Sequence, residues 1–379
     1  MTTLDLIATA TFGLEAVVKR EIEALGYPIV DSRDARITYA ADERGIVRSN
    51  LWLRSADRVY VRLAEFNALS FEDLFQHCAA IPWEKWIPQD GRFPVAGTSV
   101  KSGLHSVPDC QAIIKKAIVT RLQHTYDHEW FPETGAQYPV RFTILKDCVT
   151  VMLDTSGEGL HKRGYRVSDV EAPMKETLAA ALIGLSFYRA DRLMTDPMCG
   201  SGTLAIEAAM LGRNIAPGLS RAFVSQEWAA IPQELWAQEK RAAYEAIDHD
   251  APVRVHASDR DRKAVEAAKA NAAEAGVEDC IDFRVAPVSD LAEKEPYGMI
   301  ITNPPYAQRI GTQKHLNGIY RDLAAFMATR PTWSLFLLTA DPSFEGRFGR
   351  PADRKRKLYN GRLQVCYYQY HGQRPPVRA

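Results

Sequence analysis

The sequence predicts an α/β protein in which a doubly wound, mostly parallel sheet follows a smaller α+β region. From residue 192 onward, strand and helix patterns alternate, as is typical of a parallel sheet with helices on both faces. Near the end of the chain, strand patterns at 354–359 and 362–370 flank Asn360-Gly361, a strong signal for a two-residue hairpin. The predicted sheet therefore closes with an antiparallel hairpin.

The composition sets the broad class. A chain of 379 residues is long enough for two or three domains. Because 47 Lys and Arg balance 47 Asp and Glu, a nucleic-acid surface must be a local patch. The six cysteines show no CxxC pair, so we expect neither a zinc site nor a disulfide framework, and we expect a reducing cytoplasm. No metal, membrane-spanning segment or signal peptide is expected, and the oligomeric state is not predicted.

The first two domains are predicted as α+β units at 1–63 and 64–157. The first contains a strand at 4–11, a helix opened by Gly13, and strand patterns at 36–39, 45–47 and 59–63. The second contains helices at 70–80 and 109–123 and strands at 92–95, 140–145 and 149–153. Its segment 98–106 is small and polar, so Lys101 and Ser102 are candidates for phosphate contact, although an ordinary solvated loop fits equally well.

The third domain is predicted at 158–379. A basic segment around Arg163 precedes a helix that begins near Met174. The alternating elements that follow are strands at 192–198, 253–258, 281–286, 298–302 and 333–340, and helices at 202–211, 261–275 and 318–329. In such a sheet, ligands bind at the carboxyl ends of the strands.

A glycine-rich turn follows the first of these strands. The glycines let a ligand approach the backbone, and the helix that follows offers its N–H groups. Part of this turn also matches the GxGxxA pattern of a nicotinamide site. The full turn reads Asp196-Pro197-Met198-Cys199-Gly200-Ser201-Gly202-Thr203.

Two carboxylates favour a different cofactor. Asp196 would repel a pyrophosphate but can receive a cationic amino group. The next strand ends at Asp259, 57 residues past Gly202 rather than about 20, and this carboxylate can accept both hydroxyls of a ribose. An amino group, a close backbone approach and a ribose together describe S-adenosylmethionine.

Asn303-Pro304-Pro305-Tyr306 ends the fourth strand of the third domain. The two prolines fix the backbone, so the Asn303 amide and the Pro304 carbonyl point in a definite direction. Two acceptors suit an exocyclic amine, and Tyr306 can stack on a flat ring. A plain proline turn with a buried tyrosine is the simpler interpretation of the tetrapeptide taken alone. Its place opposite the glycine-rich turn favours a site that methylates an amine.

Over essentially its whole length the sequence resembles the class I methyltransferases with a Rossmann-like catalytic domain and an N-terminal ferredoxin-like plus THUMP RNA-binding region. It is most similar to the RNA guanine-N2 methyltransferases that act on 23S rRNA or tRNA. The resemblance rests on segments 11–15, 163–166, 172–179, 196–203, 206–209, 258–259, 303–306 and 356–361.

The resemblance implies roles for further residues. The segment from Arg163 to Arg166, which contains Tyr165, would frame the methionine end of the cofactor together with Lys175, Glu176 and Thr177. Asp259 would bind its ribose. The family usually has an acid near the adenine amine, where this chain reads Ala286-Pro287-Val288-Ser289-Asp290. Either Asp290 reaches the adenine, or backbone and packing hold it. Cys199 is interpreted as a small filler of the cofactor turn.

RNA is the expected partner, and the basic segment 347–362 is the expected contact, although a solvated hairpin is the alternative. Four consecutive cations in it are the candidates: Arg354, Lys355, Arg356 and Lys357. The resulting hypothesis is methylation of a guanosine N2 amine, most simply in 23S rRNA. Alternatives are guanine-N2 methylation of tRNA, adenine-N6 methylation of RNA or DNA, a noncatalytic RNA-binding factor and a nicotinamide oxidoreductase.

Overall fold

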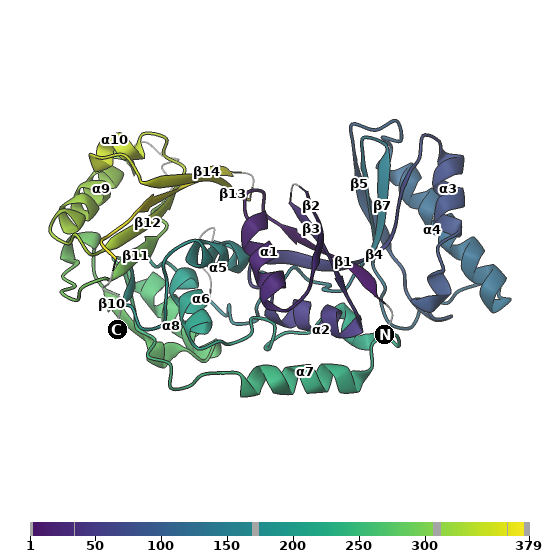
Figure 1. The fold of residues 1–379 in the computed structure, drawn as a ribbon, viewed down its shortest axis with the longest axis horizontal. Helices are drawn as coiled ribbons and strands as arrows, with labels where there is room; N and C mark the ends of the chain where they lie inside the picture. The colour runs from purple at the N-terminus through teal and green to yellow at the C-terminus, as the bar shows by residue number, and fades with distance from the viewer. Residues whose placement is uncertain (1–2, 34, 169–173, 306–311, 362, 375–379) are drawn as a thin grey trace. The chain divides into compact units, whose positions relative to one another are not determined.

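The computed structural model describes residues 3–33, 35–168, 174–305, 312–361 and 363–374. The predicted site residue Tyr306 lies outside the described residues. The chain forms two compact units. Unit 1 comprises residues 1–10, 19–160 and 221–242, and unit 2 comprises residues 11–18, 161–220 and 243–379 (Figure 1).

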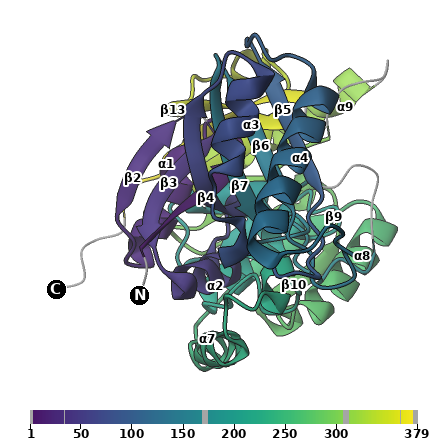
Figure 2. The same ribbon diagram turned by 90° about the vertical axis from the view of Figure 1, so that its right-hand side faces the viewer.

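Unit 1 is built on one seven-stranded sheet of order β2-β3-β1-β4-β7-β6-β5. Among the described strands, β5 and β6 pair in parallel and the other neighbours pair antiparallel. Helices α3 and α4 pack side by side over the strands β5 to β7 (Figure 2). The strands are β1 (Leu4–Ala10), β2 (Ile29–Arg33), β3 (Arg36–Ala41), β4 (Ala56–Asn67), β5 (Val95–Val100), β6 (Val140–Leu145) and β7 (Cys148–Asp154). The helices are α1 (Glu15–Ala24), whose first turn belongs to unit 2, α2 (Glu43–Trp52), α3 (Phe71–Ala79) and α4 (Val107–Tyr126).

Three local predictions in unit 1 are wrong. Residues 45–47 lie in α2 and not in a strand, because the Asp42 carboxylate accepts a hydrogen bond from the Gly45 N–H at 2.9 Å and caps the helix. The strand expected at 92–95 begins only at Val95. Residues 98–100, expected in a loop, belong to β5, because parallel pairing with β6 occupies their backbone groups.

A segment from the second half of the chain completes unit 1. Residues 221–242 include the short helix η2 (Val224–Glu227) and most of α7 (Gln233–Glu245). Trp228 is almost fully buried, donates from Nε1 to the Gln137 carbonyl at 2.8 Å and stacks on Tyr138 with ring centroids 5.1 Å apart. The sequence pattern marks this stretch only as a tryptophan-rich insertion, whereas the structure shows it as core of unit 1.

Unit 2 contains the predicted doubly wound sheet, with order β10-β9-β8-β11-β12-β14-β13. Strands β8 to β12 are parallel, and the hairpin β13–β14 is antiparallel, as the sequence predicted. The strands are β8 (Met194–Asp196), β9 (Val255–Asp259), β10 (Ile281–Val285), β11 (Met299–Thr302), β12 (Ser334–Thr339), β13 (Arg354–Asn360) and β14 (Leu363–Tyr370). The helices are α5 (Glu176–Gly184), α6 (Thr203–Gly212), α8 (Arg262–Glu274), α9 (Thr312–Ala328) and α10 (Phe344–Phe348), with short helices η3 (Glu278–Cys280) and η4 (Val288–Asp290).

The sheet of unit 2 is buried on both faces. Alternate residues of β11 pack into two separate core clusters: Met299 and Ile301 contribute to the cluster that includes α5, α6 and α8. Ile300 contributes to the cluster that includes α9 and α10. Burial on both sides explains why the sequence of this strand is a continuous apolar run. None of the helices in the described parts of the chain is long and apolar enough to cross a membrane.

Replacing Trp228 by alanine should lower the free energy of unfolding of unit 1 by about 3–5 kcal/mol, because a large buried ring and its hydrogen bond are lost. The measurement is urea denaturation followed by far-UV circular dichroism. Trp130, which is 77% exposed, offers a matched control, and Trp130→Ala should change stability by less than about 0.5 kcal/mol. Equal effects of the two substitutions would contradict the assignment of residues 221–242 to this core.

Candidate functional site

The glycine-rich turn connects β8 to α6 at the carboxyl edge of the parallel sheet. Gly202 adopts φ +85° and donates its N–H to the Cys199 carbonyl at 2.8 Å. A Cβ at Gly202 would lie 3.0 Å from the Cβ of Ala268 on α8. Glycine is therefore required both by the left-handed backbone and by the close approach of α8.

Asp259, at the end of β9, ties its strand to this turn. Its Oδ2 accepts a hydrogen bond from the Gly200 N–H at 3.1 Å, and its Oδ1 accepts one from the Asp261 N–H at 3.0 Å. The Cys199 N–H donates to the Ser258 carbonyl at 2.9 Å, which adds a second link between the turn and β9. A carboxylate has about four acceptor positions, so Asp259 retains capacity for the two ribose hydroxyls that the sequence analysis assigned to it.

Asp196, at the end of β8, meets the end of β11. Its Oδ1 accepts a hydrogen bond from the Thr302 hydroxyl at 2.7 Å and a longer one from the Met198 N–H at 3.3 Å. The side chain is buried, and burial raises its pKa to about 7, with the neighbouring charge of Asp259 acting in the same direction. Thr302 immediately precedes Asn303, so the two motifs found in the sequence lie in one site.

Asn303 and Pro304 leave β11 at this edge. Asn303 is partly exposed and Pro304 is buried, so Pro304 anchors the turn. Tyr306 lies outside the described residues, so its predicted stacking role stays a prediction.

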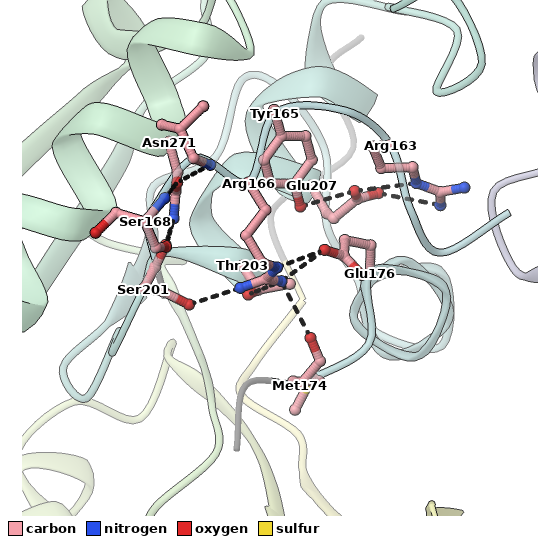
Figure 3. A network of polar contacts seen from close by, with 11 residues as sticks. Arg163, Tyr165, Arg166, Ser168, Met174, Glu176, Ser201, Thr203, Glu207 and Asn271 are labelled. Carbon is pink, nitrogen blue, oxygen red and sulfur yellow. Dashed lines mark hydrogen bonds and ion pairs between the residues drawn. The ribbon is translucent and has the colours of Figure 1, made fainter. Parts of the chain in front are cut away.

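Arg166 joins two segments of the site (Figure 3). Its guanidinium donates to Glu176 Oε1 on α5 at 2.6 and 2.8 Å. It also donates to the hydroxyl oxygens of Ser201 at 2.9 Å and Thr203 at 3.1 Å, both in the glycine-rich turn. Burial raises the pKa of Glu176, although the nearby Arg166 acts to lower it. The family resemblance implied that Arg166, as part of segment 163–166, helps to frame the methionine end of the cofactor, and that role stays a prediction.

Asn271 on α8 makes a second link that the sequence analysis missed (Figure 3). Its Nδ2 donates to the carbonyls of Ser168 at 2.9 Å and Ser201 at 3.1 Å, and its Oδ1 accepts from the N–H groups of Val167 and Ser168 at 3.0 Å. The residue is fully buried. Asparagine has low helix propensity. Its presence among alanines in a helix interior was therefore the sequence feature that could have indicated a special role for this residue.

Arg163 and Tyr165 lie close to a third residue, Glu207 on α6. Arg163 donates from Nε to Glu207 Oε1 at 3.3 Å, and the Tyr165 hydroxyl donates to the same oxygen at 3.1 Å. All three side chains are buried, and burial holds the pKa of Tyr165 well above its usual value. These contacts fix segment 163–166 on α6, and the predicted contact of Arg163 and Tyr165 with the cofactor stays a prediction.

The other predicted cofactor residues are distributed around this site. Lys175 is exposed and forms the N-cap of α5, whereas Thr177 is buried in the first turn of that helix. Pro197 and Cys199 are buried in the glycine-rich turn, as a filler role for the cysteine predicts. Asp290 is exposed at the end of η4, which follows β10.

The cations predicted to bind RNA have different surroundings. In unit 1, Lys101 is exposed with φ +52°, and Ser102 caps the same turn by accepting from the Asp147 N–H at 3.1 Å. In unit 2, Lys355 pairs with Glu345 at 2.6 Å and Arg356 donates to the Gly13 carbonyl at 2.9 Å.

Arg354 and Lys357 are exposed on β13, and no carboxylate among the described residues lies within 4 Å of them. The same described residues contain no group of three His, Cys, Asp or Glu side chains that would hold a metal ion.

Comparison with known protein families identifies three regions. Residues 163–369 match the RMKL-like methyltransferase domain, more than half of the chain. Residues 5–60 match the RlmL ferredoxin-like domain, and residues 68–154 match the THUMP domain. The chain belongs to the RMKL-like methyltransferase family. The predicted resemblance to THUMP-containing class I RNA methyltransferases and the predicted α/β fold class are thereby confirmed.

Two curated relatives are similar over nearly the whole chain. One is "Putative RNA methyltransferase YpsC" of Bacillus subtilis, 47% identical over 98% of this chain and 97% of the relative. The other is Ribosomal RNA large subunit methyltransferase K/L of Syntrophotalea carbinolica, 33% identical over 95% of this chain. The chain spans about half of that second relative, 52% of its length.

Solved structures agree in fold over the whole chain. SMU.472, described as "a putative methyltransferase complexed with SAH", has a TM-score of 0.94 and 43% identity, covering 99% of this chain and 100% of that one. "A predicted N6-adenine-specific DNA methylase" from Listeria monocytogenes has a TM-score of 0.94 and 45% identity, covering 98% of this chain and 97% of that one. S-adenosylmethionine is accordingly the cofactor of this methyltransferase. The donor set fits it, since Asp196 is a buried carboxylate suited to an ammonium group and Asp259 retains acceptors for hydroxyls.

Asp196→Asn should weaken S-adenosylmethionine binding roughly 10- to 100-fold, because the amino group loses its charged partner. In the wild-type protein we expect affinity to fall about tenfold for each pH unit below about 7, as Asp196 becomes protonated. Isothermal titration calorimetry between pH 5.5 and 8.5 measures both effects. A flat wild-type profile would contradict this role for the carboxylate.

The same substitution should stabilise the ligand-free protein at pH 8. The folded protein retains the Asp196 proton up to about pH 7, whereas the unfolded chain releases it near the ordinary value of 3.8. Stability attributable to this group therefore falls as pH rises from about 4 to 7, and asparagine removes that loss. Thermal melts of the two proteins without cofactor at pH 5 and 8 measure the difference.

Asn271→Asp should weaken S-adenosylmethionine binding roughly 5- to 50-fold at pH 8, because a carboxylate oxygen then faces the carbonyls of Ser168 and Ser201. The ratio of variant to wild-type dissociation constants should approach one at low pH, where the protonated acid again donates. Asn50→Asp is the matched control, since Asn50 is a buried asparagine that donates to Ile46 and Thr155 in unit 1. It should lower stability without changing cofactor affinity. Equal losses of affinity in both variants would exclude a specific role for Asn271.

Proposed function

We propose that this enzyme transfers the methyl group of S-adenosylmethionine to the exocyclic N2 amine of a guanosine in structured RNA, most simply 23S rRNA. The observation that carries the proposal is the hydrogen bond between Thr302 and Asp196. It joins the strand that precedes Asn303 and Pro304 to the glycine-rich turn. With the cofactor held in that turn, as we propose, two acceptors for an amine would lie beside the methyl donor.

The mechanism requires positioning more than base catalysis. The lone pair of the target amine is delocalised into the ring, and acceptors at the Asn303 amide and the Pro304 carbonyl favour its nucleophilic form. Nitrogen then attacks the methyl carbon, the carbon–sulfur bond breaks, and the nitrogen afterwards loses a proton to water. Alignment of reacting groups can supply about 7–11 kcal/mol in well-oriented systems. Tyr306 would replace the stacking that the base loses when it leaves its helix, about 1–3 kcal/mol.

RNA as substrate is supported by the THUMP domain and by the names of the relatives. One relative is a ribosomal RNA large-subunit methyltransferase and is 33% identical over nearly the whole of this chain. The choice of guanine as the target base, and of its N2 amine as the methyl acceptor, rests on the family resemblance alone. We further propose that Lys101 and Ser102 of unit 1 and Arg354 and Lys357 of unit 2 contact phosphates, and that the enzyme is cytoplasmic, as six free cysteines suit a reducing compartment.

Adenine-N6 methylation is the second candidate. Adenine also presents an exocyclic amine that Asn303 and Pro304 can accept, and the similar Listeria protein is described as an adenine-specific DNA methylase. A tRNA target would use the same chemistry. These candidates differ in the product and in the nucleic acid that carries it.

Mass spectrometry of nucleosides distinguishes all of these candidates. rRNA, tRNA and DNA are isolated from a strain that lacks the gene and from its parent. The proposal expects loss of N2-methylguanosine from large-subunit rRNA only. Loss of N6-methyladenosine, or a loss confined to tRNA or DNA, would replace it with the corresponding alternative. An unchanged pattern in every fraction would favour a noncatalytic RNA-binding factor.

Asn303→Ala should lower kcat about 10²- to 10³-fold, as does removal of one preorganised hydrogen-bonding group at a reacting centre. Affinity for S-adenosylmethionine should change little, because the substitution leaves Asp196 and the glycine-rich turn intact. Single-turnover methylation of rRNA from the deletion strain, with calorimetry for the cofactor, separates the two effects. Turnover at the wild-type rate would overturn the proposed mechanism.

A further inference from the structure

Two exposed aromatic side chains meet at the edge strand of the sheet in unit 2. Phe12 is 51% exposed and Tyr359 is 37% exposed. Their ring centroids lie 6.3 Å apart with the planes at 72°, an edge-to-face contact. Aromatic rings of this size are usually covered, so a solvent-facing pair is a candidate binding surface.

The backbone around Phe12 is fixed against β13. Gly13 adopts φ +90°, and a Cβ there would lie 3.0 Å from the Lys357 carbonyl oxygen. Arg356 donates to the Gly13 carbonyl at 2.9 Å, and Leu14 is buried in the core of unit 2. Because glycine is needed for this approach, the position of Phe12 beside Tyr359 is specified by the sequence.

The register of the strands places this pair at the same edge of the sheet as Asn303. Thr339, the last residue of β12, pairs with Cys366, which pairs with Lys357. Tyr359 lies two residues further along β13, so it projects about 7 Å past the end of β12. The carboxyl end of β11, where Asn303 leaves the sheet, lies at this edge.

The distance across the sheet from β11, which precedes Asn303, to β13, which carries Tyr359, suits a flanking part of the same substrate. Strands β12 and β14 separate β11 from β13, which gives three strand spacings, or about 14 Å. Lys357 lies on the same face of β13 as Tyr359, because side chains alternate along a strand. It is exposed, and no acidic side chain among the described residues pairs with it. The surface thus combines aromatic faces with a positive charge, as sites for unpaired nucleotides do.

We propose that Phe12 and Tyr359 form a stacking site for an unpaired RNA base that flanks the target nucleotide, with Lys357 binding its phosphate. The site deepens the proposed function, on which it rests for the identity of the ligand. Stacking is tolerant of base identity, so this site orients the strand toward Asn303 and does not select the target base.

The test compares Phe12→Ala, Tyr359→Ala and Tyr359→Phe. The probes are fluorescein-labelled dodecauridylate and deproteinised 23S rRNA from the deletion strain. Each alanine variant should bind the oligonucleotide about 5- to 150-fold more weakly, whereas Tyr359→Phe should bind almost like wild type. Affinity for S-adenosylmethionine should not change. Tyr244→Ala is the matched control, since Tyr244 is 57% exposed on α7, and it should bind RNA like wild type.

Salt dependence separates stacking from charge. The alanine variants at Phe12 and Tyr359 should keep the wild-type slope of log affinity against log salt. Lys357→Ala should reduce that slope by about 0.7, the value for one phosphate contact on a single strand. Ultraviolet crosslinking of wild-type protein to dodecauridylate, followed by peptide mass spectrometry, should recover nucleotide on the peptide that contains Tyr359.

The outcomes distinguish the two proposals. If the wild-type protein binds and methylates RNA while both alanine variants bind it like Tyr244→Ala, the stacking site is overturned and the proposed function stands. If the wild-type protein binds neither probe, both proposals are overturned. If Phe12→Ala or Tyr359→Ala binds RNA more weakly and also reduces the slope of log affinity against log salt, stacking is likewise overturned as the interaction.

Discussion

The hydrogen bond from Thr302 to Asp196 holds the candidate site together. It forms because β11 pairs with β8 on one side while β9 pairs with β8 on the other, so β8 is the point where the strand order reverses. Ligands of doubly wound sheets bind outside the carboxyl ends of the strands at such a point. The glycine-rich turn and the Asn303-Pro304 segment are therefore next to each other as a consequence of topology.

The burial of the Asp196 carboxylate explains why the site is suited to a cation. Within the described residues, the buried carboxylates Glu176 and Glu207 each have an arginine partner, whereas no cationic side chain lies within 4 Å of Asp196. Leaving a buried carboxylate with only neutral donors is costly, and the raised pKa of Asp196 expresses that cost. We propose that a bound ammonium group removes this cost, so that the energy the fold gives up at Asp196 is recovered when the cofactor binds.

The sequence was sufficient to place the candidate site residues that lie at the ends of strands, although their roles stay predictions. Asp196, Asp259 and Asn303 terminate apolar runs, and a parallel sheet brings such ends to one edge. Asn271 was missed because its partners lie up to about a hundred positions away and only tertiary packing selects them. Residues 45–47 were misassigned because a short apolar stretch does not distinguish a strand from a capped helix. The insertion at 221–242 shows the same limit, since no local pattern reveals which unit buries it.

The basic segment 347–362 shows how the contacts in the structure refine a prediction of RNA binding that is based on charge. The segment is rich in cations, but Lys355 is paired with Glu345 and Arg356 supports Gly13, so these side chains have structural contacts of their own. Because the protein has no net charge, we expect phosphate contacts to supply only part of its RNA affinity. Contacts that do not depend on charge must supply the rest. Aromatic stacking is such a contact, and it also restricts the angle at which a strand crosses the catalytic edge, which a methyl transfer in line requires.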